Sequence, residues 1–195
     1  MATDDALARC WWAGGETPGD ELMARYHDSE WGVPVADEVE LFERLILECF
    51  QAGLSWSTIL RKRDGFRTAF RGFDPGVVAR FSDDDRARLL GDGSIVRNRA
   101  KIDAAIGNAV AFLATTAEFG SFSGYLASMV PAPPTRLAAG VTLADLPATT
   151  PSSDALSRDL KARGFKFVGS TIVYAFMQSV GLVDDHLPGC FRYAG

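Results

Sequence analysis

Residues 82–113, SDDDRARLLGDGSIVRNRAKIDAAIGNAVAFL, carry the pattern that decides the fold. Ser82 followed by three aspartates predicts the start of a helix that ends at Gly91, because acidic side chains complement the positive end of the helix dipole. A second helix is indicated by an apolar stripe at helical spacing, formed by Ile102, Ile106, Val110 and Leu113. The turn Gly91-Asp92-Gly93-Ser94 connects the two helices through Ile95. The segment is therefore a candidate helix-hairpin-helix motif.

Helical patterns extend on both sides of this motif. From Asp37 to Phe50, apolar residues recur at helical spacing and predict a core helix. Further helices are expected at residues 55–70, weakened near Gly65, at 74–81 with Pro75 in the first turn, at 155–163 capped by Ser152-Ser153-Asp154 and ended by Gly164, and at 170–180 stopped by Gly181. Because no run of residues alternates as a strand does, the predicted fold class is all-α.

The length and composition suit an ordinary globular protein. The chain has 195 residues, 47% hydrophobic and 23% charged, enough for one domain or two small lobes. Its start, Met-Ala-Thr-Asp-Asp, lacks the basic and apolar regions of a signal peptide, so we expect a cytoplasmic protein. The longest uncharged stretch, residues 167–183, is shorter than the roughly 20 residues of a membrane span. We interpret it as a buried core helix and expect no membrane association.

A formal net charge of −5 normally disfavours a nucleic-acid partner, but the basic residues are not spread evenly. They form three clusters: Arg61, Lys62, Arg63, Arg67 and Arg71; Arg97, Arg99 and Lys101; and Lys161, Arg163 and Lys166. Each cluster is either a contact surface for phosphates or simply a solvated helix face.

The two histidines of the chain, His27 and His186, are each accompanied by a cysteine, Cys10 and Cys190. Together they would make a tetrahedral Cys2His2 set, and thiolate and imidazole are ligands that zinc prefers. Four protein ligands leave no position for water, so such a zinc would be structural and would join the two chain ends. Alternatively, the four residues are unconnected, since one His-x-x-x-Cys spacing is weak evidence. Cys49, on the apolar side of its helix, is most simply a buried thiol.

Several longer motifs resemble one known family. They are Arg9-Cys10 with Trp12, YHDSEWGVP at 26–34, Glu48 with QAGLSW at 51–56, IVRNRAKI at 95–102 with Asn108-Ala109, RGFKFVG at 163–169, and HLPGC at 186–190. In this order, from Arg9 to Cys190, the chain resembles 3-methyladenine DNA glycosylase I.

The resemblance implies a helix-hairpin-helix DNA glycosylase fold in which a zinc-stapled lobe joins the N- and C-termini. One unit of two lobes is expected, the helix-hairpin-helix lobe at about 37–150 and the zinc lobe at about 1–36 plus 151–195. The implied activity is hydrolysis of the N-glycosidic bond of 3-methyladenine in double-stranded DNA, without a lyase step. One structural zinc is implied, with Cys10, His27, His186 and Cys190 as its ligands. We expect a monomer.

Glu48 is the candidate catalytic residue. On a helical wheel it lies about 20° from Leu41, at the border of the apolar side, where a carboxylate is costly to bury unless it meets a donor or a cation. The resemblance implies that Glu48 hydrogen-bonds the extruded base, whose alkylation at N3 makes it cationic. The alternative is a core-edge glutamate paired with Arg44 or another basic residue.

Aromatic side chains are the candidates for holding the base. A cationic purine gains from an aromatic face, so Tyr26 and Trp56, with Trp12 and Trp31 nearby, could enclose it. The alternative for each tryptophan is a place in the core. Where the family usually has a tyrosine, three residues before Tyr26, this chain has Met23, so one pocket wall is expected to be softer and base discrimination looser.

Two segments are candidates for contact with DNA. In the first, Gln51, Gly53 and Leu54 lie between two helices, where glycine permits close backbone approach and leucine could act as a wedge in the duplex. In the second, the hairpin would offer backbone N–H groups to phosphates, with Arg97, Arg99 and Lys101 alongside.

No general base is assigned, because between Ala104 and Phe122 the chain offers only Glu118 as a carboxylate. The interval from Cys10 to His27 also looks lengthened, at residues 13–19, which a surface loop would absorb. Two other functions stay open: a DNA-damage binding module without activity, and a zinc-stabilised protein whose aromatic residues bind a protein partner.

Overall fold

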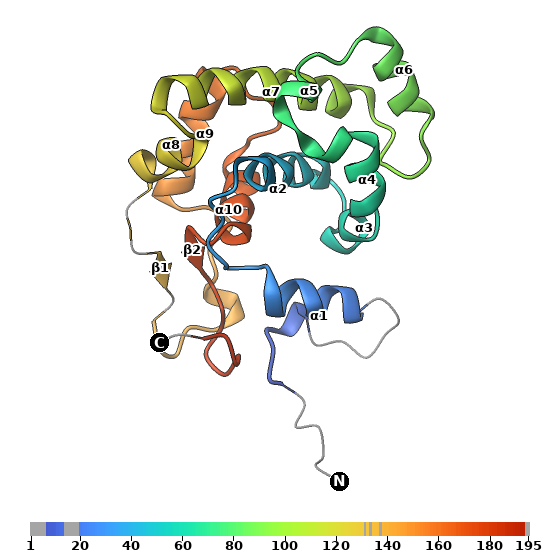
Figure 1. Cartoon of the computed structure of the whole chain (residues 1–195). Helices are drawn as coiled ribbons and strands as arrows, with labels where there is room; N and C mark the ends of the chain where they lie inside the picture. Colours follow the sequence, from blue (N-terminus) through green and yellow to red (C-terminus); the bar gives the residue numbers. More distant parts are fainter. Residues whose placement is uncertain (1–6, 14–19, 131, 133, 137, 194–195) are drawn as a thin grey trace.

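The computed structural model describes residues 7–13, 20–130, 132, 134–136 and 138–193, and most of them are helical (Figure 1). The α-helices are α1 (Asp20–Ser29), α2 (Glu38–Gln51), α3 (Trp56–Arg61), α4 (Arg63–Ala69), α5 (Pro75–Val78), α6 (Asp83–Gly91), α7 (Arg99–Phe119), α8 (Phe122–Met129), α9 (Pro151–Ala162) and α10 (Ser170–Ser179). Short 3-10 turns are η1 (Trp11–Ala13), η2 (Arg71–Phe73) and η3 (Leu143–Asp145). The all-α prediction is confirmed.

Helix α2 forms the centre of the molecule and packs against α7, α8 and α10 (Figure 1). The side chain of Asp37 caps its first turn by accepting a hydrogen bond from the backbone N–H of Glu40 at 2.8 Å. From Leu41 to Phe50 every residue is buried, including the charged ones. A helix buried on all sides in this way brings its polar side chains into the interior, where each requires a partner.

The predicted helix-hairpin-helix is present as α6, a turn, and α7. Ser82 and Asp85 form a capping box at the start of α6, and Asn98 caps α7 by accepting from the N–H of Lys101 at 3.1 Å. In the turn, the Asp92 carboxylate accepts from the N–H of Ser94 at 2.8 Å. Gly65, on α4, packs against this turn, because a Cβ there would lie 2.8 Å from atoms of Ser94.

The two ends of the chain meet beside α1. The N–H of Phe191 donates to the carbonyl of Ala8 at 2.7 Å, and Arg192 donates to the carbonyl of Asp28 at 2.7 Å. A pair of two-residue parallel strands, β1 (Thr135–Arg136) and β2 (Val183–Asp184), ties a preceding loop to the same region. The C-terminal residues that could bind a metal therefore lie next to α1, which contributes His27.

Several local predictions require correction. The single helix expected at 55–70 is two helices, and the break falls at Lys62 rather than near Gly65. The cap of α9 is Thr150, with Pro151 in the first turn, rather than residues 152–154. The helix expected at 74–81 ends at Val78, and the β1–β2 pair was not foreseen, because two-residue strands leave no alternation in the sequence.

The stretch at 167–183 contains α10, a core helix of ten residues, as predicted. Among the described residues, no helix has the length and apolarity that crossing a bilayer requires. Residues 14–19, which make up most of the lengthened interval after Cys10, lie outside the described residues.

Candidate base-binding pocket

A cavity of about 290 Å³ opens between η1, α1, α2, α3 and α10. Its lining is mostly aromatic and apolar, with a few polar side chains. The lining residues are Cys10, Trp11, Trp12, Met23, Tyr26, Trp31, Glu48, Gln51, Trp56, Leu146, Ala175, Gln178, Asp185 and Leu187. A cavity of this kind, with few polar groups converging on it, is typical of a small-molecule site.

The structure brings the candidate base-binding residues together at this cavity. Tyr26 and Trp56 lie with ring centroids 5.2 Å apart at an interplanar angle of 50°, and Trp12 and Trp31 lie 5.1 Å apart at 79°. Met23, from the same helix as Tyr26, lines the cavity and is half-buried. Tilted and edge-on geometries of this kind are the ones that aromatic pairs prefer, so the rings stabilise one another at the cavity.

Glu48 lies at the cavity with 3% of its surface exposed. Its Oε2 atom is buried and has no hydrogen-bond partner among the described residues. Burial raises the pKa of Glu48 to about 8, and the charge of Arg44 opposes this only in part. The Nε1 atom of Trp56 is likewise buried and unpaired within the described part of the chain. Buried polar groups normally have partners, so two unpaired ones at one cavity point to a ligand that supplies them.

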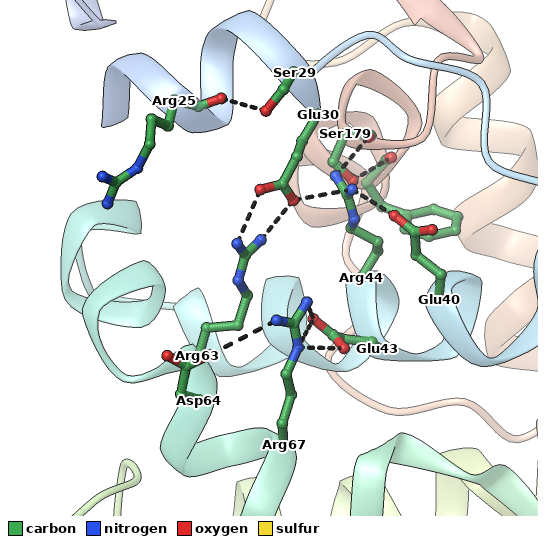
Figure 2. A network of polar contacts seen from close by, with 11 residues as sticks. Arg25, Ser29, Glu30, Glu40, Glu43, Arg44, Arg63, Asp64, Arg67 and Ser179 are labelled. Carbon is green, nitrogen blue, oxygen red and sulfur yellow. Dashed lines mark hydrogen bonds and ion pairs between the residues drawn. The ribbon is translucent and has the colours of Figure 1, made fainter. Parts of the chain in front are cut away.

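Arg44 lies one helical turn before Glu48 but is directed elsewhere (Figure 2). Its Nη2 atom is 2.6 Å from Glu40 and 3.1 Å from Glu30, and its Nη1 donates to the carbonyl of Ser179 at 3.1 Å. The interpretation of Glu48 as a glutamate paired with Arg44 is therefore wrong.

A second cluster lies beside the cavity. The ligand atoms of Cys10, His27 and Cys190 lie within 4.8 Å of one another, and all three residues are buried. His27 Nε2 is 3.3 Å from the Cys190 sulfur and 3.4 Å from the backbone nitrogen of Cys10. Burial raises the pKa of the Cys10 thiol to about 12, and a bound cation would offset this by favouring the thiolate. These three residues could hold a metal ion.

His186 lies at the edge of this cluster, with its ring centroid 5.1 Å from that of His27. Its Nε2 atom is buried without a partner among the described residues, while its Nδ1 is 2.7 Å from Asp184. His27 Nδ1 is similarly 2.8 Å from Asp28. A carboxylate behind the imidazole is the usual support of a metal-binding histidine. Of the four predicted ligands, the group whose ligand atoms all lie within 4.8 Å of one another contains Cys10, His27 and Cys190 and does not include His186.

Gly32 makes this arrangement possible. It adopts φ +74°, and a Cβ there would lie 2.8 Å from Cε1 of His186. Cys49 is separate from the cluster. Its thiol is buried and donates to the carbonyl of Lys166 at 3.7 Å, so it is a buried thiol as predicted.

The candidate DNA-contact residues divide into two groups. Gly53 and Leu54 lie in the turn between α2 and α3. Gly53 has φ +78° and open space where a Cβ would be, and Leu54 is 41% exposed. Gln51 lines the cavity below them. Arg97 and Arg99 are exposed beside the hairpin.

Lys101 differs from its expected role. It is 7% exposed, and its Nζ donates to the carbonyls of Phe50 at 2.9 Å and Ala52 at 2.6 Å. Burial lowers the pKa of its ammonium group. Lys101 therefore caps the C-terminus of α2 and does not lie beside the exposed arginines, because the unpaired carbonyls at a helix end attract a cation.

Sequence reasoning missed part of the pocket. Asp185 is buried at the cavity and accepts hydrogen bonds from the Tyr174 hydroxyl at 2.5 Å and from Gln178 at 2.6 Å. The sequence feature that could have indicated Asp185 as a site residue is its position directly before His186. Trp11, 64% exposed beside Trp12, and Leu146 also line the cavity. Leu146 carried no signal, because it reaches the site only through the long loop before α9.

The fold and the site define a class of protein: an all-α helix-hairpin-helix protein with an aromatic pocket, a buried carboxylate of which one oxygen has no partner in the described part of the chain, and a Cys/His cluster. A family model described as methyladenine glycosylase matches residues 12–193. The chain is 47% identical to DNA-3-methyladenine glycosylase 1 of Escherichia coli (strain K12) over 97% of this chain and 98% of that protein.

Solved structures of related proteins support the same family assignment. A crystal structure of 3-methyladenine DNA glycosylase I superposes with a TM-score of 0.88 at 48% identity, covering 95% of this chain and 99% of that chain. A structure described as the basis of 3-methyladenine recognition, from the Staphylococcus aureus enzyme, gives a TM-score of 0.88 at 36% identity over 97% and 98%. The chain belongs to the methyladenine glycosylase family.

Proposed function

We propose that this protein is a monofunctional DNA glycosylase that releases 3-methyladenine from double-stranded DNA and leaves an abasic site. The observation that carries the proposal is Glu48 at an aromatic cavity of about 290 Å³, with its buried Oε2 atom unpaired among the described residues. The relatives named above support it, since they are DNA-3-methyladenine glycosylases. A DNA substrate also fits the cytoplasmic location expected from the sequence.

The chemistry follows from the charge of the damaged base. Methylation at N3 makes the adenine cationic, so it leaves as a neutral base when its bond to deoxyribose C1′ breaks. Water adds to C1′ as a hydroxyl, and its other proton goes to the solvent. Little acid catalysis is needed, and the protein's task is to bind and orient the base. Glu48 accepts a hydrogen bond from the base and balances the positive charge of the base. Tyr26 and Trp56 contact the faces of the base. Stacking of this kind contributes about 1–3 kcal/mol per base.

Met23 lines this pocket, at the position where the family resemblance implies a tyrosine. A thioether adapts its shape more readily than a ring, so we propose a looser selection among alkylated bases than in relatives with tyrosine there. Comparing the bases released by wild type and by Met23→Tyr tests this; an identical product ratio would contradict it.

We propose that the turn after α2 enters the DNA. Gly53 allows close backbone approach, Leu54 fills the gap left by the extruded nucleotide, and Gln51 lies between that gap and the pocket. Arg97 and Arg99 contact phosphates beside the hairpin. Replacing both by alanine should weaken DNA binding and reduce the slope of log K against log salt by about 1 for each phosphate that is no longer neutralised. An unchanged slope would favour a protein-interaction role for the surface instead.

We propose one structural zinc, bound by Cys10, His27, Cys190 and His186. The unpaired Nε2 of His186 and the carboxylates behind both histidines support it as the fourth ligand. When bound, zinc supplies a link between the chain ends and not a reacting group, because four protein ligands leave no open position. We also propose that the protein is a monomer made of two lobes.

Base release tests the activity. The protein is incubated with methylated DNA, and the released bases are separated by chromatography beside a heat-treated control. We expect 3-methyladenine above the control. Binding to abasic-site DNA without release would favour a damage-binding module that has lost its activity.

A further inference from the structure

Three arginines and three glutamates form two adjacent groups of ion pairs, together called the arginine–glutamate network (Figure 2). The ion pairs join Arg44 to Glu40 and Glu30, Arg63 to Glu30, and Arg67 to Glu43. Asp64 adds a longer contact of 3.7 Å to Arg67 from a side chain that is 99% exposed. The charges of the three arginines and the three glutamates cancel, so the network needs no further carboxylate.

Glu48 is the carboxylate left outside this balance. Residues 44 and 48 are four apart on α2, where side chains of an α-helix are neighbours and opposite charges attract. Arg44 is nevertheless held by three acceptors other than Glu48, namely Glu40, Glu30 and the carbonyl of Ser179, and its guanidinium carbon lies 5.8 Å from the centroid of the Tyr26 ring. Although burial opposes it, the hydrogen bond from Arg63 leaves the pKa of Glu30 below its usual value. Glu30 is thus ionised and able to hold Arg44.

We propose that Glu30 and Glu40 are positioning residues that hold Arg44 away from Glu48, so that the positive charge that Glu48 requires is supplied by the ligand and not by the protein. This inference rests on the proposed function for its ligand, a cationic alkylated base. Burial keeps the Glu48 carboxyl protonated near neutral pH, and a cationic base favours its ionised form whereas a neutral base does not. An Arg44–Glu48 pair would have to be broken by any base that enters. The acidic residues far from the reacting bond therefore contribute to selection of a charged base.

The test compares five proteins. Glu30→Gln/Glu40→Gln releases Arg44, and adding Arg44→Met to it removes the competing cation. Glu43→Gln is the matched control, because it breaks the Arg67 pair of the same network without touching Arg44. Folding is checked by circular dichroism. If the double variant does not fold, Glu40→Gln alone, on a side chain that is 45% exposed, gives the same comparison at smaller amplitude.

Two readouts are needed, release of 3-methyladenine and titration of the Glu48 carboxyl by carbon NMR. The signal is assigned by its loss in Glu48→Gln. Charged and titratable groups around it are Tyr26 from α1, Arg44 and Cys49 from α2, and Asp185 at the cavity. Glu30→Gln also releases Arg63 of α4, so Glu40→Gln alone, which keeps the Arg63–Glu30 pair, is measured beside the double variant to separate the effect of Arg44.

In the double variant we expect release to fall about tenfold to hundredfold, since a charge-assisted hydrogen bond must be broken. The pKa of Glu48 should fall by about 1–3 units. Adding Arg44→Met should restore release to within a few-fold of wild type and should raise the pKa of Glu48 again. In Glu43→Gln, release and the pKa of Glu48 should both stay near the wild-type values.

Wild-type release and an unchanged Glu48 titration in the folded double variant would overturn the inference, as would a fall in release that Arg44→Met does not rescue. If wild type itself releases no 3-methyladenine, the proposed function fails, and the titration still decides whether Glu30 and Glu40 control Arg44.

Discussion

Glu48 combines two properties that rarely occur together, full burial and the absence of a partner, among the described residues, for one carboxylate oxygen. Its neighbours along α2, Leu47 and Cys49, are also buried, so the residue cannot turn to solvent without moving the core helix. The unpaired oxygen costs stability in the free protein. That cost is recovered when a cationic, hydrogen-bonding ligand arrives, which is how a binding site can favour its ligand over water.

This cost predicts a pH-dependent gain in stability for Glu48→Gln. The folded pKa of about 8 lies above the ordinary 4.5, so the folded protein binds the extra proton between these values and loses stability as pH rises through them. Glutamine carries no such proton. In urea unfolding, the variant should be close to wild type at pH 5 and more stable at pH 8 by a few kcal/mol. Equal differences at both pH values would contradict the raised pKa.

Among the elements, α7 links the hairpin to the pocket. Its first turn follows the hairpin, and Lys101 in that turn holds the carbonyls of Phe50 and Ala52 at the end of α2. These carbonyls directly precede Gly53 and Leu54. The position of the proposed wedge therefore depends on a residue of the helix that follows the hairpin.

Lys101→Met should lower the free energy of unfolding by about 1–3 kcal/mol, because it leaves two buried carbonyls at a helix end without their donor. The exposed Arg99 on the same helix is the control, and Arg99→Met should stay within about 0.5 kcal/mol of wild type. Urea unfolding of the two variants measures both. A Lys101→Met protein as stable as wild type would show that water replaces the ammonium group without cost.

For the molecule as a whole, sequence patterns predicted the class and the helix-hairpin-helix, since apolar periodicity and capping residues are local. The candidate pocket residues Glu48, Tyr26 and Trp56 came from motif resemblance, and the structure brings them to one cavity. Contacts between distant segments could not be predicted. The capture of Lys101 by α2 carbonyls depends on how α7 crosses α2, and the Arg44–Glu30 pair depends on how α1 meets α2.

The Cys/His cluster joins segments from the two chain ends, so metal should stabilise the molecule as a unit. We expect about one zinc per chain on metal analysis of purified protein. Removing it with a chelator should lower Tm by several degrees, given about 2–4 °C per kcal/mol for a chain of this size. His186→Ala should reduce zinc content, and Cys49→Ala, outside the cluster, should keep it. A zinc content well under one per chain in wild type would contradict the proposal.

The most direct measurement is release of 3-methyladenine from methylated DNA by wild type and by Glu48→Gln, with both proteins shown to be folded. The pocket geometry predicts release by wild type and a decrease of about two orders of magnitude or more in the variant, comparable to removal of a positioned group at a reacting charge. Equal release of 3-methyladenine by the two proteins would show that Glu48 does not take part in recognition of the base.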